Sequence, residues 1–135
     1  MKPDGKFSVL IVDAFSSDAI PVHLLTREAF TVYKRVLTAD GMLLVHISNK
    51  HPNLQPVVAA LASDADMIAR INEHEPEAAK ERSTLDYPAD LVAMARRAEN
   101  PGRIFGDTAW RAVPVRTGYP AWTDDYSNVL SVIKW

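Results

Sequence analysis

Two continuous apolar runs constrain the possible fold of this chain more than any other feature. Phe7 to Val12 reads FSVLIV and Met42 to Ile47 reads MLLVHI, so neither run shows the strict alternation of a half-buried strand. Such runs are typical of strands buried on both faces, as in a parallel sheet covered by helices. The first run is rich in Val and Ile and is bounded by Asp4-Gly5 and Asp13. We therefore predict a buried strand at each run.

The segment between the two runs has helical periodicity. Its apolar side chains recur at Ala29, Val32, Tyr33, Val36 and Leu37. Thr26 is a good N-cap, and Glu28 places a negative charge near the positive end of the helix dipole. We predict a helix that opens at Thr26-Arg27-Glu28 and ends near Ala39-Asp40-Gly41, where the glycine supplies the stop.

The same pattern continues after the second run. A second helix is predicted to begin at Pro52-Asn53, with one apolar face made of Leu54, Val57, Val58, Leu61 and Ala65. Further strands are predicted at Met67 to Ile71 and Asp90 to Ala95. The charged tract Glu75 to Thr84 suggests a solvated loop or short helix, and Asn100 to Asp125 a packed irregular region. This order of elements indicates one α/β domain with right-handed crossovers.

Polar residues follow both apolar runs at their carboxyl ends. Asp13 ends the first run, and Ser48-Asn49 follow the second. In open α/β sheets the ligand crevice lies outside the carboxyl ends of the strands. We therefore expect these two polar clusters to converge on one edge of the sheet.

The composition excludes several classes of function. The 135 residues are 47% hydrophobic and 24% charged, with a formal net charge of -2. The sequence contains no dense stripe of Lys and Arg, so we expect no binding to nucleic acid or to an anionic membrane. The absence of cysteine excludes disulfides and thiolate metal sites and fits a reducing compartment. The start MKPDGKF lacks a signal-peptide core, and no apolar run approaches the roughly 20 residues that cross a bilayer. We expect a cytoplasmic protein.

Three stretches together resemble a known family. VLIVDAFSSDAIPVHLLTREAF (9–30), LTADGMLLVHISN (37–49) and WTDDYSNVLSVIKW (122–135) are similar to the spermidine synthase-like proteins, a branch of the Rossmann-type methyltransferase superfamily. The resemblance covers most of this chain but only the second half of that family's catalytic domain. It implies an α/β fold that is the second half of a Rossmann-type methyltransferase-like sheet. That fold is three-layered, with helices on the sheet faces, and an irregular carboxy-terminal region follows.

The resemblance gives roles to two aspartates after the first run. In spermidine synthases proper, the corresponding strand ends in an Asp-Ser-Ser-Asp-Pro motif, whose first aspartate helps take a proton from the attacking amine and whose second helps hold the cationic diamine. Asp13 matches the first by its place at the strand end, and Asp18 matches the second by the order Ser16-Ser17-Asp18. The two aspartates lie further apart here than in the motif, and Ala19 replaces the proline. Asp13 is thus the expected catalytic residue and Asp18 a substrate-binding residue.

The resemblance also implies further acidic residues and a missing cosubstrate site. Asp124 and Asp125 would add negative charge to the pocket of a small amine substrate. The family's first half carries a glycine-rich turn that holds the sulfonium nucleoside, and no G-x-G pattern occurs in these 135 residues. We therefore expect no cofactor on this chain alone, and S-adenosylmethionine or its decarboxylated form only in an assembled domain. Phe7 to Val12 would then be an exposed sheet edge, which predicts a homodimer or association with a separate amino-terminal half.

Other interpretations stay open at the level of sequence. The chain is alternatively a non-catalytic dimerisation or interaction module, or half of a methyltransferase with another acceptor. Ser16 and Ser17 have no visible base partner, which argues against a serine hydrolase. The four histidines form no H-E-x-x-H pattern, so no zinc site is expected, and His46 is predicted to be a hydrogen-bonded core residue. Trp110 and Trp122 are predicted to be packing residues.

Overall fold

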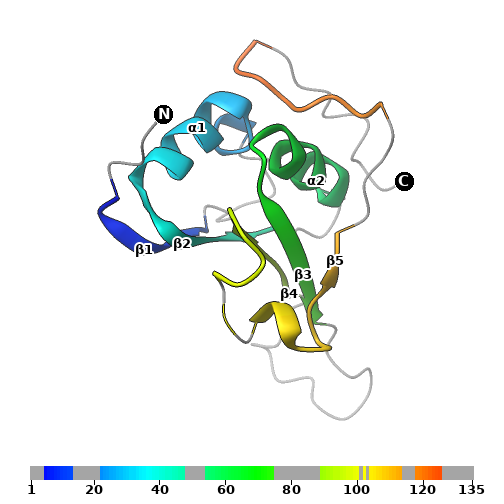
Figure 1. Ribbon diagram of the computed structural model, residues 1–135. Helices are drawn as coiled ribbons and strands as arrows, with labels where there is room; N and C mark the ends of the chain where they lie inside the picture. Colours follow the sequence, from blue (N-terminus) through cyan, green and yellow to red (C-terminus); the bar gives the residue numbers. More distant parts are fainter. Residues whose placement is uncertain are drawn as a thin grey trace, which may run out of the picture.

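The computed structural model describes residues 5–13, 22–47, 54–74, 89–100, 102, 104–113 and 118–125. These residues form five strands, two α-helices and two short 3-10 helices (Figure 1). The strands are β1 (Phe7–Val12), β2 (Leu37–His46), β3 (Ile68–His74), β4 (Ala89–Ala95) and β5 (Arg111–Ala112). The helices are η1 (Val22–Leu24), α1 (Arg27–Val36), α2 (Gln55–Asp64) and η2 (Ile104–Gly106).

The five strands form one mixed sheet in the order β1-β2-β4-β3-β5. Only β1 and β2 pair in parallel; β4 is antiparallel to both β2 and β3, and β5 is antiparallel to β3. Because β2 and β3 both oppose β4, the strands β1, β2 and β3 all run in the same direction. The mixed sheet agrees with the predicted α/β class, although β5 lies in the region predicted to be irregular. The apolar run of β4 predicts that this strand is buried but not which way it runs.

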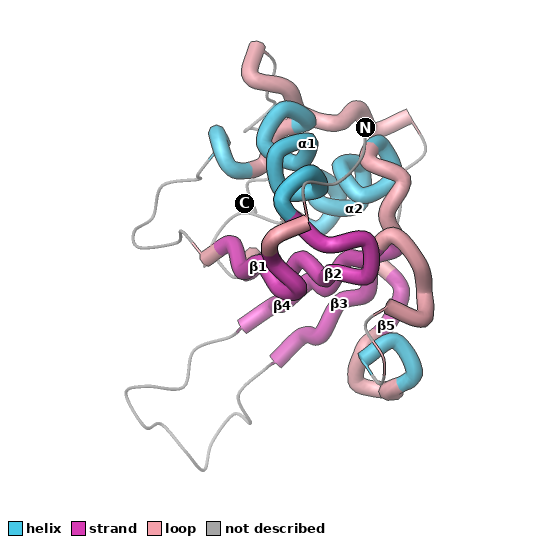
Figure 2. Tube along the Cα trace, turned by 60° about the vertical axis from the view of Figure 1, so that its left-hand side comes forward, coloured by secondary structure: helices cyan, strands magenta, loops and turns pink. Residues whose placement is uncertain are grey.

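Both α-helices cover the same face of the sheet (Figure 2). The core between them and the sheet includes Phe30 from α1, most of α2 and alternate residues of β2. In α2 every residue from Pro56 to Ala62 is buried. The described residues are thus a mixed α/β arrangement of two layers, and the three-layer arrangement of a Rossmann-type sheet is not confirmed by them.

The strand β1 has the predicted bounds and the edge position expected for this chain alone, but not the burial on both faces that its apolar run predicts. It is the terminal strand in the described part of the sheet, and its side chains alternate in exposure. Phe7, Val9 and Ile11 are 50%, 47% and 63% exposed, whereas Leu10 and Val12 pack against the core. The prediction that this run is buried on both faces is therefore wrong for the face away from the helices.

The start of α1 confirms its predicted cap, but its end lies elsewhere. Thr26 accepts a hydrogen bond from the Ala29 backbone N–H at 3.2 Å. The helix ends at Val36, and Leu37 is fully buried and already extended, as the first residue of β2. Gly41, predicted to stop the helix, lies inside β2 instead. Pairing of Leu37 with Phe7 and burial of the Leu37 side chain override the local glycine signal.

The second helix and the later strands lie near their predicted positions. α2 begins at Gln55, three residues after Pro52, and β3 and β4 contain most of the two predicted strands. Trp122, predicted to be a packing residue, is fully buried, and its carbonyl accepts a hydrogen bond from the Arg27 N–H at 2.7 Å. None of the helices that the structure describes has the length and apolarity to cross a membrane.

Candidate functional site at the carboxyl edge of the sheet

Asp13 and His46 meet where β1 and β2 end. Val12 pairs with Val45 in the parallel register, so the residues that follow them, Asp13 and His46, are neighbours. The Asp13 Oδ1 and His46 Nδ1 atoms are 3.0 Å apart. The Asp13 side chain is 62% exposed and that of His46 26% exposed. The register of the two strands therefore fixes a carboxylate–imidazole pair that solvent reaches.

The position of His46 on its strand explains why it is accessible. Leu43, Val45 and Ile47 point into the core, so His46 belongs to the opposite face of β2 with Leu44. Leu44 is level with Ile11 of β1, which is also exposed on that face. The prediction of a hydrogen-bonded His46 is confirmed, but the residue is only partly buried and is not a core residue. An apolar surface from Ile11 and Leu44 leads up to the polar pair.

The structure places Asp124 against the start of α1. Asp124 Oδ1 accepts a hydrogen bond from the Thr26 hydroxyl at 2.8 Å, and the Asp124 N–H donates to Glu28 Oε2 at 3.0 Å. Thr26 itself is 1% exposed and also caps the helix. Asp124 therefore fastens the 118–125 segment to α1. Asp125, its neighbour, is exposed.

α1 covers one face of the sheet and leads directly into the start of β2, whereas His46, and with it Asp13, lies on the opposite face. Of the four predicted site residues, Asp13 therefore lies with His46 on the face away from the helices, whereas Asp124 and Asp125 lie beside the start of α1. Among the described residues no hydrogen bond or ion pair joins these two groups. Asp18 and Ser48-Asn49 lie outside the described residues, so their predicted place at the carboxyl edge of the sheet stays a prediction.

The His46 contact was not predicted from the sequence. His46 ends a strand, and Asp13 directly follows the neighbouring one. A histidine at the end of one strand and a carboxylate directly after a parallel neighbouring strand together indicate such a pair. The pair can be recognised only when the register is known, here Val12 with Val45.

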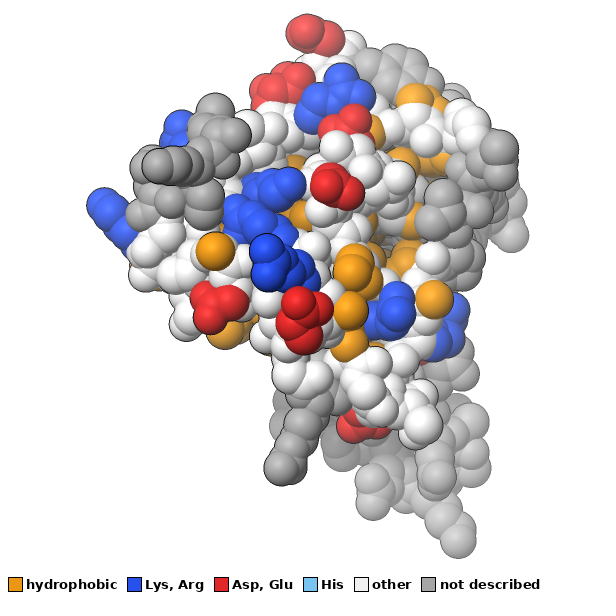
Figure 3. All heavy atoms as spheres, viewed as in Figure 1, with side chains coloured by type: hydrophobic (Ala, Val, Ile, Leu, Met, Phe, Trp, Pro, Cys, Tyr) orange, Lys and Arg blue, Asp and Glu red, His pale blue; other side chains and the backbone are white. Residues whose placement is uncertain are grey.

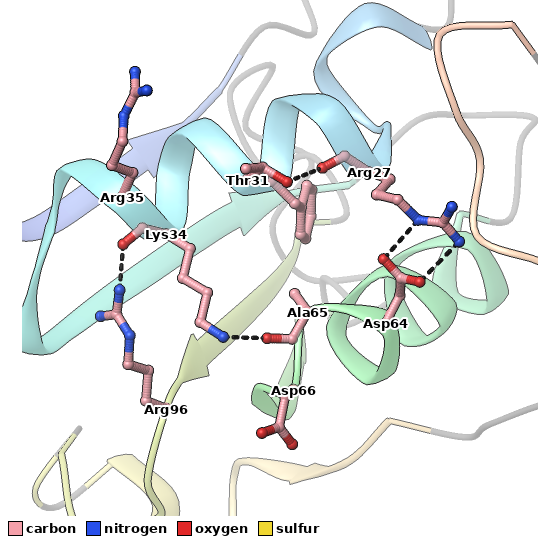
Figure 4. A pocket seen from close by; sticks show the side chains of 9 residues that line it. Arg27, Thr31, Lys34, Arg35, Asp64, Ala65, Asp66 and Arg96 are labelled. Carbon is pink, nitrogen blue, oxygen red and sulfur yellow. Dashed lines mark hydrogen bonds and ion pairs between the residues drawn. The ribbon is translucent and has the colours of Figure 1, made fainter. Parts of the chain in front are cut away.

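A cavity of about 370 Å³ lies away from this site, between α1, the end of α2 and the residue after β4 (Figure 4). Its lining contains four basic and two acidic residues: Arg27, Lys34, Arg35, Arg96, Asp64 and Asp66. Basic and acidic side chains also gather together on the face shown in Figure 3. Since β2 and β3 begin beside the ends of α1 and α2, this cavity extends toward the opposite edge of the sheet from Asp13.

Most charges around this cavity serve the fold. Arg27 Nη2 is 2.8 Å from Asp64 Oδ1, and the hydrogen bond to this carboxylate, together with its charge, raises the pKa of Arg27. Lys34 Nζ donates to the Ala65 carbonyl at the end of α2, and Arg96 donates to the carbonyls of Lys34 and Thr38 near the end of α1. Cations are favoured at helix carboxyl ends. We interpret the cluster as structural.

A second cavity, of about 340 Å³, lies between α2, β3 and β5, where Ser63, Asp66 and Arg70 stand among small and apolar side chains. Such a lining offers few groups for chemistry. Within the described ranges, no group of three or more His, Asp or Glu side chains could hold a metal ion.

Comparisons of the chain with protein-family models, with curated proteins and with solved structures found no match.

Proposed function

We propose that this chain forms the acceptor-amine side of a spermidine synthase-like transferase of the aminopropyltransferase type. The strand order supports the proposal. The strands β1, β2 and β3 run in the same direction with α1 and α2 in their connections. Strands 4, 5 and 6 of a doubly wound sheet follow one another in the same way. In this chain β4 is inserted antiparallel between β2 and β3.

The single observation that carries the proposal is the place of Asp13. It stands directly beyond the carboxyl end of β1, where ligands bind in open α/β sheets, and its side chain is 62% exposed. An amine attacks the carbon next to a sulfonium only when it is unprotonated, so a carboxylate at this place can orient the amine and draw off its charge.

The donor would be S-adenosylmethionine or its decarboxylated form, held by a part of the domain outside these 135 residues. The exposed outer side of β1 is the natural place for that part to join, because an edge strand offers unpaired backbone groups to a further strand. Phe7, Val9 and Ile11 add apolar surface to the junction. The aminopropyl transfer itself then needs both parts.

A second function is favoured by the same strand. Three large apolar side chains exposed along six residues of an edge strand also suit an interaction module that pairs with a second copy of itself. Such a module would need no acceptor site. Binding of an amine at Asp13 therefore separates the two functions.

Isothermal titration calorimetry with putrescine, S-adenosylmethionine and decarboxylated S-adenosylmethionine tests the proposal. We expect weak putrescine binding that Asp13→Asn reduces at least tenfold and that Asp40→Asn leaves unchanged. Asp40 is an exposed carboxylate at the other end of β2, where it accepts a hydrogen bond from Thr38. Tight binding of either nucleoside by the lone chain would contradict the proposed division of the site. The absence of any amine binding would leave the interaction module as the better function.

A further inference from the structure

The contact between Asp13 and His46 gives the imidazole a defined tautomer. A carboxylate accepts hydrogen bonds but has none to donate when ionised, so at 3.0 Å the His46 Nδ1 atom must carry the proton. In a neutral imidazole the other nitrogen then holds the basic lone pair. The basic atom of His46 is therefore Nε2, and Asp13 fixes the plane of the ring.

We propose that His46 Nε2 accepts the proton of the acceptor amine and that Asp13 acts as a positioning residue. This inference rests on the proposed function and changes the role of Asp13 within it. Histidine is the side chain that most often acts as a general base, provided that it is held within hydrogen-bond reach of the proton it accepts. A base held in place by an acid is also the arrangement of catalytic triads, in which the acid orients the imidazole without taking the proton.

Three features of the surroundings fit this role. His46 is 26% exposed, so the ring meets solvent while its strand neighbours Val45 and Ile47 anchor it in the core. The backbone around it is held on both sides, because β2 pairs with β1 and His46 is level with Leu91 of β4. A base on such a rigid element keeps its geometry better than one on a loop.

The apolar neighbours explain how a diamine would lie. Ile11 and Leu44 precede the polar pair on the same face and are level with each other. A chain of methylene groups along these two side chains would bring one amino group to His46.

The chemical step balances with a sulfonium donor. The acceptor ammonium loses one proton to His46 Nε2, and the neutral amine attacks the carbon next to the sulfonium. The new C–N bond forms as the C–S bond breaks, and the electron pair of the C–S bond goes to sulfur, which leaves as a neutral thioether. His46 then returns its proton to solvent. No oxidant, reductant or metal ion takes part.

Nitrogen-15 NMR of the histidine side chains tests the inference on the chain as it exists. Long-range proton–nitrogen spectra of the neutral form should show His46 with its proton on Nδ1, and Asp13→Ala should reduce that tautomer several-fold. Asp40→Ala is the matched control and should leave it unchanged. Because Asp13 is well exposed, its replacement should not prevent folding.

Addition of putrescine to the same samples provides the second measurement. The His46 Nε2 resonance should shift in the wild type and not in Asp13→Ala, while the exposed His23 in η1 should not respond. A neutral His46 with its proton on Nε2 would overturn the inference and leave the proposed function standing. Binding of putrescine without any response from His46 would also overturn the inference alone. No binding of putrescine in any sample would overturn the proposed function, and the inference with it.

Discussion

Replacing Thr26 with valine should weaken the fold at the point where two distant parts of the chain meet. The Thr26 hydroxyl accepts from the Ala29 N–H at the start of α1 and donates to the Asp124 carboxylate at 2.8 Å. Valine keeps the shape of the side chain but makes neither hydrogen bond. Since Thr26 is 1% exposed, water cannot take the place of the lost partners without a local rearrangement.

The expected loss follows from these two contacts. Loss of an N-cap costs about 1 kcal/mol, and loss of a hydrogen bond to a charged group about 1.5 kcal/mol when the charge can regain water, as the exposed Asp124 can. Thr26→Val should therefore lower the free energy of unfolding by about 2 to 2.5 kcal/mol. For a domain of this length that corresponds to a fall in Tm of roughly 7 to 9 °C.

Urea unfolding followed by tryptophan fluorescence and circular dichroism measures this change. Thr31→Val is the matched control, because Thr31 lies on the same helix, is exposed and donates only to the Arg27 carbonyl one turn back. We expect that variant to stay within about 0.5 kcal/mol of the wild type. A double-mutant cycle with Asp124→Ala should give a coupling of about 1 kcal/mol. If Thr26→Val and Thr31→Val are equally stable, Asp124 does not fasten its segment to α1.

Three further predictions concern the sheet edge, β2 and alkaline pH. Val9→Glu should lower the average mass seen by sedimentation at micromolar concentration, whereas Val32→Glu, equally exposed on α1 at 47%, should not. Gly41→Ala should cost about 1 to 2 kcal/mol in urea unfolding, since its Cβ would lie 3.0 Å from the Thr38 carbonyl oxygen, while Gly106→Ala, with open space around it, should be neutral. Burial raises the pKa of Tyr33. The protonated Tyr33 hydroxyl therefore contributes fully to stability below about pH 10, and this contribution is lost as the pH rises through the pKa of Tyr33 in the folded protein. Tyr33→Phe should reduce that alkaline loss.

Each of these predictions has a contrary outcome. A wild-type chain that sediments as a monomer at micromolar concentration would contradict association through β1. An alanine at position 41 that stabilises the protein would show that β2 moves to accept the methyl group, since glycine in a strand is otherwise unfavourable. If the free energy of unfolding falls equally in the wild type and in Tyr33→Phe between about pH 9 and 11, the loss of stability at alkaline pH does not come from Tyr33.

Local signals in the sequence were sufficient for features that depend on neighbouring residues. The bounds of β1 follow from the mostly apolar run Phe7 to Val12 between Gly5 and Asp13, and the start of α1 follows from the cap at Thr26. Gly41 was misleading because glycine also fits a crowded strand, and only the burial of Leu37 and its pairing with β1 show that the chain is already extended there. Propensity could not compete with that tertiary contact.

The candidate site depends on information that no local pattern contains. Asp13 was predicted from the end of its strand, but its partner required the direction and register of β2 beside it. The sequence pattern of His46 is that of a residue inside an apolar strand, and its exposure appears only once the core-facing side of β2 is known. Likewise, the antiparallel direction of β4 is set by pairing with two other strands and not by its own residues.

The most direct test of the acceptor site is a backbone chemical-shift map of the wild-type chain with putrescine. We predict shifts concentrated around Asp13 and His46, at the carboxyl edge of the sheet, with little change around Lys34 and Arg96 at the other edge. Loss of the first set of shifts in Asp13→Asn would agree with this prediction. Shifts confined to the cavity beside Lys34 and Arg96, or equal shifts in the wild type and in Asp13→Asn, would contradict it.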